Sequence, residues 1–224
     1  MDKSNTNKDF ASYLDFARHK ANTTEKDVRE LCLKTVEYKF NSSFVNPYYV
    51  KFAKSILNDQ AKVGTVASFP LGQDVFSIKS AAIRQALVDG ADEIDVVLNI
   101  GFIKEHAWEK CYEEMSTLVK IVKDFDDTKI IKYIPEVGYL TEDEIKKVAE
   151  LMVKSGVDFF KTCSGYGPRG SRLEDVTLIR SVIGNAIKIK VAGGISTYEQ
   201  AREFIRMGAD RIGTSLAVEI IQHY

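Results

Sequence analysis

Short apolar runs alternate with longer amphipathic segments along the whole chain. Eight of the runs are typical of buried strands, because they are rich in β-branched or small residues and end at turn residues. These strands are predicted over Tyr13–Phe16, Ser42–Asn46, Lys62–Phe69, Ala91–Gly101, Lys129–Gly138, Phe159–Cys163, Lys188–Lys190 and Asp210–Ser215.

The segments between the strands have the apolar spacing of helices. Thr24 starts a capping pattern before the first long helix, and Thr141 with Glu144 forms a capping box for a later one. The helices are predicted over Glu25–Phe40, Pro47–Leu57, a segment ending near Asp89, Ala107–Phe125, a segment ending near Ser155, Leu173–Ile183, Thr197–Met207 and a short segment from Leu216.

Regular alternation of strands and helices predicts a parallel sheet with right-handed crossovers. Eight such units favour closure into a (β/α)8 TIM barrel, and we expect residues 1–224 to form a single domain with a frayed extension at residues 1–9. An open doubly wound sheet is the alternative. The first strand–helix turn lacks the G-x-G-x-x-G pattern, which weakens a dinucleotide-binding interpretation.

Composition narrows the class of protein. The chain of 224 residues is 45% hydrophobic and 28% charged with a net charge of −1, which disfavours a nucleic-acid or anionic-membrane partner. The polar start and the lack of a long apolar run predict a cytoplasmic protein. Cys32, Cys111 and Cys163 are too widely spaced for a disulfide framework or a zinc site.

Two lysines stand in apolar strands where a buried charge is unexpected. Lys161 precedes a glycine-rich turn, and Lys190 ends the next strand before Gly193 and Gly194. On neighbouring strands the two amines would lie about 5 Å apart. At an effective dielectric of about 20 they would repel by roughly 3 kcal/mol, enough to lower one pKa by about 2 units. We therefore expect Lys161 to act as an amine nucleophile near neutral pH.

A carboxylate completes this candidate site. Asp95 falls near the carboxyl end of the fourth strand, where barrel enzymes place working residues. It is suited to relay protons in carbinolamine and imine steps, or simply to pair with a lysine. The three histidines, His19, His106 and His223, show no ligand spacing, which disfavours a metal-dependent mechanism.

Glycine clusters follow each of the last three strands. Backbone amides in late barrel loops often bind phosphate, because glycine permits a close approach of the anion. One such cluster alone would be explained by a tight turn. Three in succession, at Gly165–Gly170, Gly193–Gly194 and Gly213–Ser215, predict phosphate binding by these loops.

Taken together, these stretches resemble the deoxyribose-phosphate aldolase family over nearly the whole chain. The resemblance is carried by FVNP, SFPLG, DEIDVVLNIG, DFFKTCSGYGPRG, KVAGGIST and RIGTS, in this order. It implies a (β/α)8-barrel class I aldolase without metal or other cofactor. Such an enzyme reversibly cleaves 2-deoxy-D-ribose 5-phosphate to acetaldehyde and D-glyceraldehyde 3-phosphate. By resemblance, Lys161 forms the Schiff base, Lys190 perturbs its pKa and Asp95 takes part in proton relay. The resemblance also implies that the phosphate is bound at Gly165, Gly193, Gly194, Gly213 and Ser215.

The resemblance further implies that the partners are sugar phosphates and aldehydes, and that the chain forms a homodimer or higher oligomer. Several positions depart from the family pattern, namely Phe16 and Ala17 in place of His-Thr, Phe44 in place of cysteine and Ser196 in place of arginine. Arg169 is a candidate to replace that arginine. Many members end in a tyrosine on a mobile tail that assists proton transfer. This chain ends in Tyr224, but the tail after its last predicted helix is very short, which disfavours such a role.

Two rival functions remain open. One is a Schiff-base aldolase of altered sugar-phosphate specificity, which the four departures suggest. The other is a catalytically silent barrel that only binds a sugar phosphate.

Overall fold

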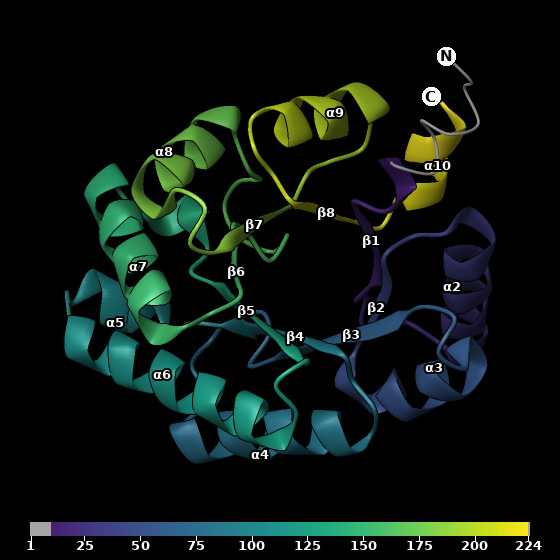
Figure 1. Cartoon of the computed structure of the whole chain (residues 1–224), viewed down its shortest axis with the longest axis horizontal. Helices are drawn as coiled ribbons and strands as arrows, with labels where there is room; N and C mark the ends of the chain where they lie inside the picture. Colours follow the sequence, from purple (N-terminus) through teal and green to yellow (C-terminus); the bar gives the residue numbers. More distant parts are fainter. Residues whose placement is uncertain (1–9, 224) are drawn as a thin grey trace.

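The computed structural model describes residues 10–223 and has the predicted architecture (Figure 1). Eight parallel strands close into a barrel in chain order, and β1 pairs with β8. The strands are β1 (Leu14–Arg18), β2 (Ser42–Val45), β3 (Lys62–Ala67), β4 (Glu93–Val97), β5 (Ile130–Ile134), β6 (Phe159–Lys161), β7 (Lys188–Ala192) and β8 (Arg211–Thr214). The (β/α)8 prediction is confirmed, whereas the frayed extension predicted for residues 1–9 and the terminal Tyr224 lie outside the described residues.

Helices surround the barrel on its outer side (Figure 1). Their apolar faces pack against the outward side chains of the strands and form one continuous core. These helices are α2 (Glu25–Tyr38), α3 (Val50–Leu57), α4 (Phe76–Val88), α5 (Ile100–Lys104), α6 (Trp108–Phe125), α7 (Glu142–Ser155), α8 (Leu173–Ile183), α9 (Tyr198–Arg206) and α10 (Ala217–Gln222). Between residues 10 and 223, none of the helices combines the length and the apolar character needed to cross a membrane.

Local signals in the sequence set several helix starts. Thr24 accepts a hydrogen bond from the backbone of Asp27 at the start of α2, and Thr141 and Glu144 cap α7 reciprocally, as predicted. Pro47 opens a 3-10 turn that leads into α3.

The fourth predicted strand was too long. β4 ends at Val97, and the short helix α5 begins at Ile100 within the range predicted as strand. The side chain of Asn99 accepts a hydrogen bond from the Gly101 amide and thereby caps this helix. This capping interaction starts a helix within the apolar run that suggested a continuous strand. The fifth strand ends at Ile134, immediately before Pro135, as its missing amide requires.

Candidate active site

Charged side chains fill the centre of the barrel, which is normally apolar. Because side chains alternate along a strand, a polar residue at an inward position of a parallel barrel must meet others from neighbouring strands. Register places Lys161 level with Lys190 and Asp95 level with Lys132. The buried charged residues that meet there are Asp15 of β1, Glu93 and Asp95 of β4, Lys132 of β5, Lys161 of β6, Lys190 of β7 and Arg211 of β8.

Asp95 joins the two lysines that the sequence singled out. Its Oδ2 atom accepts a hydrogen bond of 2.9 Å from Lys161 and another of 2.9 Å from Lys190. The two ammonium nitrogens therefore lie no farther apart than twice this distance, which agrees with the predicted spacing. Burial opposes ionisation of Asp95, but the surrounding lysines outweigh it and hold the pKa of this carboxyl far below its usual range.

Lys190 has a second carboxylate partner. Its Nζ lies 2.7 Å from Asp15 Oδ2 and 3.4 Å from the centroid of the Phe44 ring. Burial lowers the pKa of Lys190 to about 8; the neighbouring ammonium groups act in the same direction, and the two carboxylates oppose them. The lowered pKa predicted for Lys161 stays a prediction.

Sequence reasoning missed Lys132. Its side chain is completely buried, contacts Glu93 and lies 3.1 Å from Asp95 Oδ1. Carboxylates raise the pKa of Lys132 above its usual value although burial alone would lower it. The signal was present, since a lysine in an apolar strand is the same anomaly that drew attention to Lys161.

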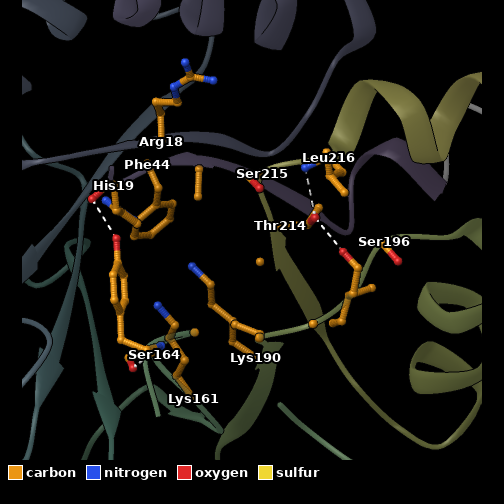
Figure 2. Close-up of a pocket in the computed structure, with 18 of the residues that line it drawn as sticks. Arg18, His19, Phe44, Lys161, Ser164, Lys190, Ser196, Thr214, Ser215 and Leu216 are labelled. Atoms are coloured by element: carbon orange, nitrogen blue, oxygen red, sulfur yellow. Dashed lines mark hydrogen bonds between the residues drawn. The ribbon is translucent and has the colours of Figure 1, made fainter. Parts of the chain in front are cut away.

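A cavity of about 480 Å³ opens above this cluster, at the carboxyl ends of the strands. Figure 2 shows the side chains of Lys161 and Lys190 reaching into it, with Phe44 on one side and Ser215 on another. The glycines predicted to bind phosphate also line it, namely Gly165, Gly193, Gly194 and Gly213. The first three have φ angles of +91°, +91° and +80°, a conformation that favours glycine. All the predicted site residues thus surround one cavity or its floor.

The loop that carries Gly165 is fixed from below by Glu136. This buried carboxylate accepts hydrogen bonds from the backbone amide and the hydroxyl of Ser164. Glu136 itself adopts a left-handed φ of +55°, which is rare for a residue with a side chain. A strained residue thus anchors the first turn of the candidate phosphate loop.

One wall of the cavity includes groups that the sequence did not point to. His19 is half-buried and its ring centroid lies 5.4 Å from that of Phe69 in a tilted arrangement, while its carbonyl accepts a hydrogen bond from the Tyr166 hydroxyl (Figure 2). Burial, followed by the charge of Lys161, lowers the pKa of His19 to about 3. Its imidazole is therefore neutral near pH 7.

The departures from the family pattern lie in different places. Ala17, Phe44 and Ser196 line the cavity, whereas Phe16 packs against Phe40 outside it. Arg169, the candidate to replace an arginine at position 196, forms a bidentate pair with Asp175 at 2.6 and 2.8 Å. Its guanidinium is thus held by Asp175 on the far side of the loop, and Arg169 does not line the cavity.

Cys163 is a packing residue. Its thiol is buried in the core, and burial raises its pKa to about 12, so that it stays protonated near neutral pH. Within residues 10–223, no group of three or more His, Cys, Asp or Glu side chains is arranged to hold a metal ion.

A family model and individual relatives match this chain over nearly its whole length. The family model described as DeoC/LacD family aldolase matches residues 2–215. The deoxyribose-phosphate aldolase of Caldicellulosiruptor saccharolyticus is 42% identical over 217 residues, which is 96% of this chain and 98% of that protein. The deoxyribose-phosphate aldolase of Thermococcus kodakarensis is 42% identical over 218 residues, with 96% of each chain covered.

Solved structures of aldolases also superpose over nearly the whole chain. The aldolase QR15 superposes with a TM-score of 0.90 at 39% identity, covering 96% of this chain and 95% of that chain. The deoxyribose phosphate aldolase of Aeropyrum pernix, described as having a unique tetrameric structure, superposes with a TM-score of 0.89 at 28% identity, covering 96% and 90%.

Proposed function

The chain belongs to the DeoC/LacD family of aldolases, and on that premise we propose that it is a deoxyribose-phosphate aldolase in which Lys161 forms the Schiff base. The reaction is the reversible cleavage of 2-deoxy-D-ribose 5-phosphate to acetaldehyde and D-glyceraldehyde 3-phosphate. The observation that carries the assignment is the Asp95 oxygen that bridges the Lys161 and Lys190 amines at the base of the cavity.

Three residues of the cluster, Lys161, Asp95 and Lys190, act in this mechanism. Neutral Lys161 attacks the aldehyde carbon C1, and loss of water from the carbinolamine gives an iminium ion. The bond between C2 and C3 then breaks, its electron pair moves into the iminium to form an enamine, and the C3 hydroxyl loses its proton, which releases glyceraldehyde 3-phosphate. The enamine gains a proton at C2, and water hydrolyses the resulting iminium to acetaldehyde and free Lys161. Asp95 and Lys190 lie within reach to carry protons to and from these positions.

Substrate orientation follows from the cavity. The loops that carry Gly165, Gly193 and Gly194 line the same cavity as Lys161, and their backbone donors are suited to receive the 5-phosphate. Ser215 and Gly213 also line this cavity. A phosphate anchored there leaves the aldehyde end of the sugar directed toward the amine of Lys161.

We extend the proposal to the setting of the enzyme. The description of the Aeropyrum relative as tetrameric supports a homo-oligomer, and we place the enzyme in the cytoplasm as part of the same proposal. The partners are then the sugar phosphate and the two aldehydes, and the whole chain of 224 residues acts as one aldolase domain.

A second candidate function differs in the substrate alone. Ser196 stands in the cavity wall without a charged side chain of its own, and Arg169 is held by Asp175. A Schiff-base aldolase that prefers a less anionic sugar fits this observation. Comparing kcat/KM for deoxyribose with and without the 5-phosphate separates the two functions.

Borohydride trapping tests the central assignment. Reduction with borohydride in the presence of deoxyribose 5-phosphate should add mass to the peptide that contains Lys161. Without borohydride, the enzyme should release acetaldehyde from the same substrate. Lys161→Met should abolish both signals and lower kcat by at least about 10³-fold, because the covalent route is lost. Trapping at another lysine contradicts the assignment, and substrate binding without aldehyde release supports the silent barrel.

A further inference from the structure

Lys132 is a third lysine inside the barrel, beneath the two that face the cavity. Its side chain is completely buried, and its ammonium lies 4.8 Å from the centroid of the Phe44 ring and 5.3 Å from that of Phe159. It contacts Glu93 and lies 3.1 Å from the Oδ1 atom of Asp95. Lys132 does not line the cavity, so it acts on a substrate only through its neighbours.

Lys132 and the two upper lysines hold opposite oxygens of one carboxylate. Oδ1 of Asp95 faces Lys132, and Oδ2 accepts hydrogen bonds from both Lys161 and Lys190. Removal of the lower contact would free the carboxylate to rotate. The contact from below therefore keeps Oδ2 directed toward the cavity.

The charges of the buried cluster do not balance when every group is ionised. Three carboxylates, Asp15, Glu93 and Asp95, meet four cationic side chains, Lys132, Lys161, Lys190 and Arg211. Lys62 also approaches Glu93 at 3.3 Å, but its side chain is 45% exposed and water screens its charge. Loss of one proton from an upper lysine makes the buried cluster neutral.

We propose that Lys132 is a positioning residue for the reaction, whose fixed positive charge orients Asp95 and favours the neutral form of the amine pair above it. This inference rests on the proposed aldolase function. Of Lys132 and Lys190, Lys132 is the one suited to remain charged, because carboxylates raise its pKa, whereas burial first, then Lys132 and Lys161, lower that of Lys190 to about 8.

The proposal sets the sign of a pH effect. Removing a nearby cation stabilises the protonated amines, so the acid limb of the kcat/KM profile moves to higher pH. Removing a nearby anion moves it to lower pH. The titratable and charged groups that face the amine pair are His19 and Asp15 from β1 and its loop, Glu93 and Asp95 from β4, Lys132 from β5, and Arg211 from β8.

The first variant is Lys132→Met, which shortens the side chain by one atom and removes its charge. Lys132 and Lys190 contact opposite oxygens of Asp95 at 3.1 and 2.9 Å, so their ammonium groups lie no more than about 8 Å apart, and at an effective dielectric of about 20 the acid limb should rise by about 1 to 2 pH units. Because the two amines titrate together, the shift belongs to the pair.

Glu93→Gln is the opposite test and changes almost no volume. Glu93 contacts Lys132 and Arg211 and does not line the cavity. The acid limb of the kcat/KM profile of Glu93→Gln should move to lower pH by about 1 unit. The double variant Lys132→Met/Glu93→Gln restores the original net charge, so its acid limb should return toward that of the unmodified enzyme. If Lys132→Met does not fold, Glu93→Gln alone still carries the test.

Lys79→Met is the matched control. Lys79 is also completely buried and paired with a glutamate, Glu114 at 2.8 Å, but it lies outside the barrel. Lys79→Met should have a lower free energy of unfolding, while the acid limb of its kcat/KM profile should stay where it is in the unmodified enzyme. An equal shift in Lys79→Met, or an acid limb unmoved in both Lys132→Met and Glu93→Gln, overturns the proposal.

The two proposals fail in different ways. If the unmodified enzyme neither cleaves deoxyribose 5-phosphate nor traps it on Lys161, the aldolase function itself is wrong. If it does both and the charge variants leave its pH profile unchanged, the role of Lys132 alone is wrong.

Discussion

Gly213→Ala is expected to disturb Lys190 by the addition of a single methyl group. A Cβ atom at this position would lie 2.9 Å from Cε and 3.8 Å from Nζ of Lys190, and 3.2 Å from Cβ of Ala192. The φ angle of Gly213 lies outside the left-handed region, so alanine meets crowding there without backbone strain. The glycine therefore provides the space that the Lys190 side chain occupies.

The size of the effect follows from these contacts. Carbon atoms pack best at about 3.5 to 4.0 Å, so Cε of Lys190 must retreat by about 0.5 to 1 Å. Its ammonium is held at 2.7 Å by Asp15 and at 2.9 Å by Asp95, and Phe44 lies behind it. A displacement of this size should lower kcat by about 10- to 100-fold, or about 1.4 to 2.7 kcal/mol in the barrier.

The assay is the steady-state release of acetaldehyde from deoxyribose 5-phosphate, with kcat and KM determined separately. The free energy of unfolding should fall by about 1 to 3 kcal/mol, as is usual for crowding in a packed interior. Gly184→Ala is the control, because its Cβ would meet nothing within 4 Å and its φ of +51° strains the chain without touching the site. It should lose stability and keep kcat.

A rise in KM with unchanged kcat would refute this reasoning. That result would mean that Gly213 serves close approach of the phosphate and not the placement of Lys190. An unchanged kcat and KM would mean that the Lys190 side chain moves aside without consequence.

Two further variants test the charges of the site. The pKa of Asp95 in the folded state lies below its unfolded value, because the lysines outweigh burial. Its contribution to stability is thus complete above about pH 4 and is lost as the pH falls through the folded pKa. Asp95→Asn should flatten the dependence of the unfolding free energy on pH below about 4 in urea titrations, and an unchanged slope contradicts this. Ser196→Arg, at the cavity wall, should lower KM for deoxyribose 5-phosphate about 5- to 10-fold through a charge-assisted hydrogen bond and leave unphosphorylated deoxyribose unaffected; equal changes for both sugars argue against phosphate binding at that wall.

Much of this protein follows from local patterns in its sequence. The alternation of apolar runs and amphipathic segments predicted eight strand and helix pairs, because burial of a strand and of one helix face are properties of short segments. Lysines in apolar strands drew attention to Lys161 and Lys190 for the same reason. Neighbouring strands of a parallel sheet keep their register over short distances, so the proximity of these two amines was also predictable.

Other features depend on where distant strands meet. Asp95 lies on β4, two strands away from Lys161, and nothing local determines that one of its oxygens reaches both amines. Nor does the sequence show that Lys132 lies beneath this carboxylate, or that Asp15 on β1 meets Lys190. These contacts cross the interior of the barrel, and their distances depend on how the strands tilt and shift when β1 pairs with β8. The sequence thus determined which charged groups enter the barrel, and closure of the barrel decided which of them touch.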